Sequence, residues 1–136
     1  KAVETLRQNI DRMGMGDRCK AFRRDAFRLS DWAEPPTGGG YTLVFVDPPY
    51  VMSRGERGAR QMPQLMQRLV LRSLLAPDAW IVLRHEARED HRAMGEAYVV
   101  EDERRYGQMA LTMFRYAGAG NSRVAVDVEP VEGNQE

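Results

Sequence analysis

The stretch Leu-Val-Phe-Val-Asp-Pro-Pro-Tyr, residues 43–50, decides the fold of this chain. Its first four residues are apolar without a break, and valine and phenylalanine favour strands, so the run predicts a strand that is buried on both faces. Pro48 and Pro49 lack the amide hydrogen that a strand ladder needs, so the strand should end at Asp47. Asp47 is therefore expected at the carboxyl end of a central parallel strand, where open α/β sheets bind their ligands.

The rest of the chain alternates predicted helices and strands, which is the order of an α/β fold. Apolar residues spaced three and four apart predict helices, and alternating or continuous apolar runs predict strands. We expect helices over residues 1–13 and from residue 59 or 60 to about residue 75, with Pro63 in the first turn of the second helix. We expect strands over residues 19–24, 43–47, 79–86, 97–102 and 108–116. A short helix or turn is expected over residues 26–32, and loops over residues 34–40 and 53–58.

Length and composition indicate one globular domain. The chain has 136 residues, of which 43% are apolar and 29% charged, and a formal net charge of zero, as is typical of a single folded domain. No apolar run is long enough to cross a bilayer and no signal-peptide pattern stands at the start. The single cysteine, Cys19, excludes an internal disulfide and suits the cytosol, so we expect a cytoplasmic protein. Cys19 itself is expected to be a buried thiol in its strand.

Two further acids fall at the ends of predicted strands. Asp25 follows the strand over residues 19–24, and Glu86 ends the strand over residues 79–86. Asp25 is also a favoured residue for a helix N-cap, and that role is compatible with binding a ligand. His85 has no second histidine near it in sequence at ligand spacing, so we predict no metal site and expect a packed histidine rather than a general base.

The tetrapeptide Asp47-Pro48-Pro49-Tyr50 resembles the motif of the amino methyltransferases, which methylate exocyclic amines of adenine, cytosine or guanine with S-adenosylmethionine. Such an amine is a poor nucleophile because its lone pair is delocalised into the ring. The resemblance implies that the Asp47 carboxylate and the Pro48 carbonyl accept the hydrogens of the amine and favour a tetrahedral nitrogen. Tyr50 would stack on a base taken out of its helix. The predicted catalytic residues are therefore Asp47, Pro48, Pro49 and Tyr50.

The same resemblance implies where the cofactor binds. In these methyltransferases the place of Asp25 carries an Asp or Asn that accepts a hydrogen bond from the adenine amino group of the cofactor. Asp25, its neighbour Ala26 and Asp47 are accordingly the predicted contacts of S-adenosylmethionine.

The order of the elements narrows the resemblance to one family. Arg105-Tyr106-Gly107 before the last strand and Glu86 at the end of an earlier one resemble the RsmD-like enzymes, which methylate guanine N2 in 16S ribosomal RNA. The resemblance covers residues 1–116, a partial methyltransferase domain, and leaves residues 117–136 as a flexible C-terminal tail. It implies a Rossmann-like class I methyltransferase sheet with helices on both faces.

One departure from this family is large. The family begins with a strand, a glycine-rich loop that cradles the cofactor and a second strand, and this chain has none of these before residue 1. We therefore expect an N-terminally incomplete chain that is inactive alone, or a natural short protein that lost catalysis. The edge of the strand over residues 43–46 that the first strand would pair with should be open, unless the strand over residues 19–24 pairs there directly. An open edge and the missing glycine-rich loop predict poor solubility and very weak cofactor binding. The complete protein is expected to be a monomer.

Three arginines after the motif suit a nucleic-acid substrate. Arg54, Arg57 and Arg60 stand close together with only Glu56 against them, and arginine binds phosphate through its bidentate fork. A solvated surface loop explains them equally well. The expected partner is ribosomal RNA or the small ribosomal subunit. A DNA methyltransferase acting on adenine or cytosine and a non-catalytic RNA-binding module remain as alternatives.

Overall fold

A computed structural model describes residues 1–28, 35 and 38–118. The chain forms two compact units, Lys1–Ala33 and Glu34–Glu136. The predicted tail lies almost wholly outside the described residues, and so does most of the short helix or turn expected over residues 26–32. None of the described helices is both long and apolar enough to cross a membrane.

The first unit consists of a helix followed by an irregular segment. Helix α1, Ala2–Arg12, confirms the helix expected over residues 1–13. The strand expected over residues 19–24 is wrong, because those residues have no regular structure. A strand is stable only beside a partner strand, and the described residues of this unit contain none. Cys19 is accordingly exposed, which corrects the expectation of a buried thiol.

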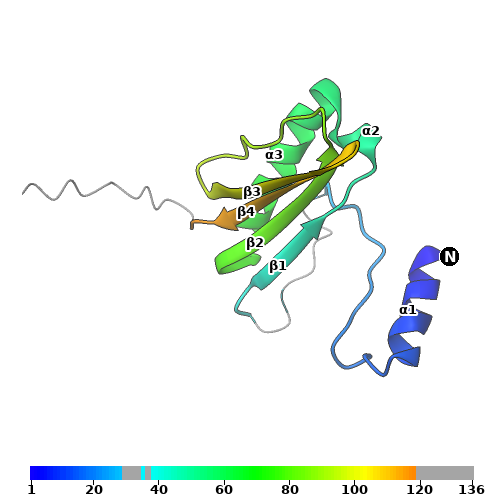
Figure 1. The fold of residues 1–136 in the computed structure, drawn as a ribbon. Helices are drawn as coiled ribbons and strands as arrows, with labels where there is room; N and C mark the ends of the chain where they lie inside the picture. Colours follow the sequence, from blue (N-terminus) through cyan, green and yellow to red (C-terminus); the bar gives the residue numbers. More distant parts are fainter. Residues whose placement is uncertain (29–34, 36–37, 119–136) are drawn as a thin grey trace, which may run out of the picture. The chain divides into compact units, whose positions relative to one another are not determined.

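The second unit is built on a four-stranded sheet with the order β1-β2-β4-β3 (Figure 1). The strands are β1 Tyr41–Val46, β2 Leu75–Glu86, β3 Tyr98–Tyr106 and β4 Met109–Tyr116. β1 and β2 are parallel, whereas β4 is antiparallel to both β2 and β3. Helices α2, Tyr50–Ser53, and α3, Gly55–Leu71, connect the parallel pair, as a βαβ crossover requires. The predicted α/β class is therefore confirmed, with a final hairpin on the sheet.

Helix α3 covers one face of this sheet (Figure 1). Its buried side chains include Met62, Leu65, Met66 and Leu69. On the covered face of the sheet, Ile81, Leu83, Ala110 and Phe114 are fully buried. Each large side chain buried in this way contributes about 1.5–3 kcal/mol. The Tyr98 hydroxyl donates to the Met66 carbonyl at 2.6 Å and so joins β3 to the helix.

The segment after the motif is helical, so the loop expected over residues 53–58 is wrong. Helix α3 begins at Gly55, and Pro63 lies inside it rather than in its first turn. Gly55 has a φ of +61° and allows the sharp turn between α2 and α3. A Cβ on Gly58 would lie 2.0 Å from the Ser53 carbonyl oxygen, so only glycine lets the two helices approach this closely. Packing of the buried methionines and leucines of α3 outweighs the hydrogen bond that Pro63 removes.

Strand β1 lies at one edge of the sheet. In the described part of the chain it pairs with β2 alone. The expectation of burial on both faces is wrong: Val46 is buried, but Leu43 and Phe45 on the opposite face are 52% and 71% exposed. The reason is that α3 covers only the face to which Val46 belongs.

Candidate active site

The motif residues lie where β1 ends. Asp47 follows the last residue of β1, and Pro48 and Pro49 lead directly into α2, of which Tyr50 is the first residue. Pro49 has φ −53° and ψ 141°, an extended conformation that proline favours. The side chain of Asp47 is 58% exposed, so its carboxylate is open to a ligand. The predicted catalytic residues thus lie together at the carboxyl end of a parallel strand.

An arginine that sequence reasoning missed joins the two main site residues. Arg84 Nη1 lies 3.3 and 3.4 Å from the two carboxylate oxygens of Asp47. The same guanidinium carbon lies 5.7 Å from the centre of the Tyr50 ring, within the range of a cation–π contact. The parallel register explains this arrangement: Val46 pairs with Leu83, so the residues that follow them are also neighbours. Placing the two predicted strands side by side in parallel, with their carboxyl ends level, could have identified Arg84 as a neighbour of Asp47.

The three arginines predicted to bind RNA have different surroundings. Arg54, the residue before α3, forms an ion pair with Glu86 at the end of β2. Arg57 Nε donates to Gln61 Oε1, one turn along α3, at 3.0 Å. Arg60 is exposed on the same helix. The structure therefore gives Arg54 a structural contact, whereas Arg57 and Arg60 lie on the helix surface.

Glu86 fastens the start of α3 to the end of β2. Its side chain is only 14% exposed and pairs with both Arg54 and Arg88. A second acid, Glu89, accepts from the Gly55 amide at 3.2 Å, at the first turn of α3. Glu86, the acid expected at the end of this strand, is thus paired with two arginines. We assign it a structural role, which is to hold the start of α3.

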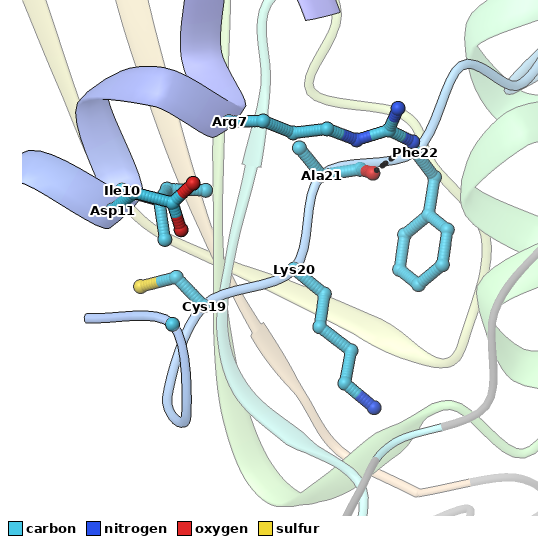
Figure 2. Close-up of a pocket in the computed structure, with 8 residues that line it drawn as sticks. Arg7, Ile10, Asp11, Cys19, Lys20, Ala21 and Phe22 are labelled. Atoms are coloured by element: carbon cyan, nitrogen blue, oxygen red, sulfur yellow. Dashed lines mark hydrogen bonds between the residues drawn. The ribbon is translucent and has the colours of Figure 1, made fainter. Parts of the chain in front are cut away.

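The first unit has an open hollow of about 260 Å³. Arg7 and Asp11 of α1 line it with Cys19, Lys20 and Phe22 of the following segment (Figure 2). The hollow contains none of the predicted site residues, and Arg7 is engaged there with the Ala21 carbonyl at 3.2 Å.

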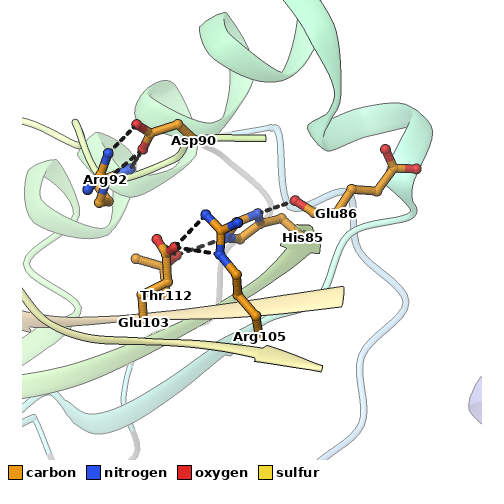
Figure 3. Close-up of polar contacts among 7 residues, drawn as sticks. All are labelled: His85, Glu86, Asp90, Arg92, Glu103, Arg105 and Thr112. Atoms are coloured by element: carbon orange, nitrogen blue, oxygen red, sulfur yellow. Dashed lines mark hydrogen bonds and ion pairs between the residues drawn. The ribbon is translucent and has the colours of Figure 1, made fainter. Parts of the chain in front are cut away.

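His85 lies on the face opposite Arg84, because successive residues of a strand point to opposite faces. It is fully buried, with Nδ1 donating to the Glu86 carbonyl at 2.8 Å and Nε2 2.8 Å from Thr112 Oγ1 (Figure 3). Glu103 lies 3.3 Å beyond the Thr112 hydroxyl. His85 is therefore a packed histidine within a buried polar network rather than a group that faces Asp47.

A second histidine packs against His85, although its sequence position did not predict this. The His91 ring lies 4.9 Å from that of His85, edge to face, and its Nε2 donates to the Ser53 carbonyl at 2.7 Å. Burial, and then repulsion from His85, lower the pKa of His91 below its usual value. This buried donor holds the last residue of α2, and so helps to fix the helix that begins with Tyr50. Among the described residues, no three metal-binding side chains gather in one place.

Asp25 and Ala26, two of the predicted cofactor contacts, lie in the first unit. The Phe27 amide donates to Asp25 Oδ1 at 2.9 Å, and Arg28 lies 3.6 Å from Oδ2. Asp25 therefore stabilises a local turn, a role related to the cap that its residue type predicted. This role leaves further acceptor positions on the exposed carboxylate.

Several solved structures share this fold and are longer than this chain. A provisionally assigned methyltransferase from Escherichia coli is 21% identical with a TM-score of 0.62, and the match covers 86% of this chain and 58% of that one. A provisionally assigned methylase from Haemophilus influenzae is 16% identical with a TM-score of 0.64, covering 84% and 65%. The rRNA methyltransferase aviRa from Streptomyces viridochromogenes is 18% identical with a TM-score of 0.56, covering 84% and 45%. This chain therefore spans less than two-thirds of the length of these three proteins.

These likenesses establish the fold as Rossmann-like, as its β1–β2 crossover indicates. No curated protein matches the chain in sequence. A family model described as "Conserved hypothetical protein 95" matches residues 1–115. This range includes the Asp-Pro-Pro-Tyr motif, Glu86 and the Arg-Tyr-Gly segment that indicated the relationship. The chain belongs to this family, that of the RsmD-like methyltransferases.

Proposed function

We propose that the protein transfers a methyl group from S-adenosylmethionine to an exocyclic base amine, namely guanine N2 in small-subunit ribosomal RNA. The observation that carries this proposal is that the half-exposed Asp47 carboxylate and the Tyr50 ring both contact Arg84 at the carboxyl end of β1. The pair offers an acceptor for an amine and a flat surface for the base that bears it. The rRNA methyltransferase among the proteins of similar fold supports RNA as the substrate class.

The residues of this chain would act by positioning. Asp47 and the Pro48 carbonyl would accept the two amine hydrogens, so that the nitrogen lone pair points away from the ring and toward the methyl donor. Tyr50 would stack on the extruded base and keep the amine at Asp47. The cofactor, when bound, supplies an electrophilic methyl group on a sulfonium. The nitrogen would bond to the methyl carbon as the carbon–sulfur bond breaks, with its electron pair staying on the sulfur. Asp47 would stabilise the positive charge that develops on the nitrogen, which would then lose one hydrogen as a proton to water.

Arg84 leaves room for a base at Asp47. A carboxylate offers about four lone-pair positions, and Arg84 reaches them through a single nitrogen at 3.3–3.4 Å. An exposed pair of this length contributes little, so an incoming amine can displace or share it.

The residues that would hold the cofactor are Asp25, Ala26 and Asp47. Each carboxylate is exposed and can accept from an amino group, which fits the adenine and ammonium groups of S-adenosylmethionine. With ribosomal RNA as substrate, we propose a cytoplasmic protein that acts on free RNA or on the small subunit.

The experiment that tests the function is a labelled methyl-transfer assay. The protein as its gene encodes it is incubated with labelled S-adenosylmethionine and, separately, with small-subunit ribosomal RNA and DNA. Label at guanine N2 of the RNA supports the proposal. Label on DNA adenine or cytosine would replace it with a DNA methyltransferase. RNA binding without any transfer would leave a non-catalytic RNA-binding module.

A further inference from the structure

The sheet end that carries Asp47 continues into a strip of arginine and tyrosine side chains. Register partners place Arg84 of β2, Leu111 of β4 and Arg104 of β3 in one row, on the same face as Asp47. The next row toward the sheet end contains Glu86, Met109 and Tyr106. We define the end strip as Arg84, Arg104, Tyr106 and Met109. None of its members takes a catalytic part in the proposed methyl transfer.

The end strip is exposed and continuous with the site. Tyr106 is 54% exposed although it is a large aromatic residue, and the Arg104 side chain is 60% exposed. Arg84 Nε contacts Met109 Sδ at 2.9 Å, while the other end of its guanidinium reaches Asp47. The carboxyl ends of β1, β2 and β3 all point to this end of the sheet (Figure 1). With neighbouring strands about 4.8 Å apart, the strip runs roughly 14 Å from Asp47 to the outer strand.

We propose that the end strip binds single-stranded RNA next to the target base, with Tyr106 as a second stacking platform and Arg84 and Arg104 as phosphate contacts. This inference rests on the proposed function, which seats the target base at Asp47 and Tyr50. A target base has to leave its stack, so its neighbours are also unpaired and can stack on an exposed ring. Basic side chains beside exposed aromatic rings form the surface that single strands bind, and the end strip offers two arginines and one ring.

Arginines at this end of the sheet can bind phosphate through their guanidinium forks, although the net charge there is balanced. Four arginines, Arg54, Arg84, Arg88 and Arg104, lie there with four carboxylates, Asp47, Glu86, Glu89 and Asp102. Arg104 pairs with Asp102 at 2.9 Å, but both side chains are substantially exposed. Ion pairs of this kind contribute little to stability, so a phosphate can take the place of the Asp102 carboxylate at small cost.

The test measures binding of a fluorescent single-stranded RNA of about twelve nucleotides by anisotropy. Tyr106→Ala should weaken binding about 5- to 150-fold, because the stacking of a base is removed, while Tyr106→Phe should bind as the unchanged protein does. Arg104→Gln should lower the slope of log K against log salt by about 0.7. Trp80→Ala and Arg115→Gln are matched controls, because both residues lie on the same face at the opposite end of the β2–β4 pair. Both controls should bind normally.

The proposal that the end strip binds RNA would be overturned if Tyr106→Ala bound RNA at wild-type strength, or if Trp80→Ala lost as much affinity as Tyr106→Ala. A duplex DNA of equal length that binds better than the RNA and depends equally on Tyr106 would also overturn it. The assay needs no methyl transfer, so it separates the two proposals. If no methyl reaches RNA and Tyr106→Ala still weakens RNA binding, the proposed reaction fails and the strip stands. If the protein methylates RNA and Tyr106→Ala does not change RNA binding, only the proposed role of the end strip is wrong.

Discussion

Arg84 on β2 holds Asp47 at the end of β1, with one guanidinium nitrogen 3.3 and 3.4 Å from the two carboxylate oxygens. The contact exists because the two strands are parallel and in register, so that neighbouring strand ends bring an arginine to the acid. Arg84 also lies over the Tyr50 ring. The acceptor and the stacking surface of the proposed site are thus joined by a cation before any base is bound.

The first prediction concerns the Tyr50 ring. If its role is to stack on the base, Tyr50→Phe should retain most of the methyl-transfer activity and Tyr50→Ala should lose it, since stacking contributes about 1–3 kcal/mol per base. Steady-state kinetics on ribosomal RNA compare the two variants. Equal damage from both would mean that the hydroxyl matters and that stacking is not the main role.

The second prediction separates the three arginines that follow the motif. Arg54 is paired with Glu86, whereas Arg57 and Arg60 lie on the surface of α3. Neutralising Arg57 and Arg60 should lower the salt slope of RNA binding by up to about 0.7–0.9 for each phosphate that these side chains bind. Arg54→Gln should instead lower the midpoint of thermal unfolding. A salt slope unchanged in the double variant would return both residues to a solvated surface.

The third prediction concerns the junction of α2 and α3. A methyl group on Gly58 would lie 2.0 Å from the Ser53 carbonyl oxygen, so the backbone must shift. Gly58→Ala should destabilise the second unit by about 1–3 kcal/mol in denaturant unfolding. Gly16→Ala is the control, because its Cβ would meet only Asp11 Oδ1 at an ordinary 3.8 Å. Similar losses of stability in the two variants would show that the close approach is not the cause.

The fourth prediction is a pH dependence of stability centred on His91. Burial and the neighbouring His85 lower its pKa in the folded state, against smaller opposing effects of the Ser53 carbonyl, Glu89 and Asp90. Because the folded pKa lies below the unfolded value of about 6.5, the unfolded chain binds the proton first. Stability is therefore fully present above about pH 6.5 and declines as the pH falls toward the folded pKa.

The decline should reach at most about 1.4 kcal/mol per pH unit for this one group. Urea unfolding midpoints between about pH 7.5 and about pH 5 measure it. His91→Gln keeps a donor for the Ser53 carbonyl but cannot titrate, so its profile should be flatter. An equally steep profile in that variant would assign the effect to other groups.

The sequence predicts a helix or strand correctly where the apolar pattern of that segment is enough to determine its structure. The strand before Asp47 and the final hairpin have continuous or alternating apolar residues, and the structure confirms their existence and type. The strand predicted over residues 19–24 is wrong. A strand needs a neighbouring strand to pair with, and the composition of a segment does not show whether such a partner exists. The helix over residues 55–58 is missed because two glycines favour a loop, although Gly58 serves a close helix contact.

The candidate site is predictable in part for the same reason. Asp47 and Tyr50 belong to one contiguous motif, so the sequence alone shows them together. Arg84 follows Asp47 by 37 residues in the sequence and Tyr106 follows it by 59. Only the register of the strands brings these two residues to the same end of the sheet as Asp47. Comparing neighbouring residues across parallel strand ends would identify Arg84.

The measurement that tests the central claim most directly is methyl transfer from labelled S-adenosylmethionine to small-subunit ribosomal RNA by the protein and its Asp47→Ala variant. Asp47 should matter mainly in the transition state, so turnover is expected to fall on the order of 10²–10⁴-fold while cofactor binding measured by calorimetry changes little. Asp17→Ala, an exposed acid of the first unit, is the control and should keep full turnover. Turnover of Asp47→Ala near that of the unchanged protein would contradict the account, because the acceptor at the end of β1 would then have no part in the reaction.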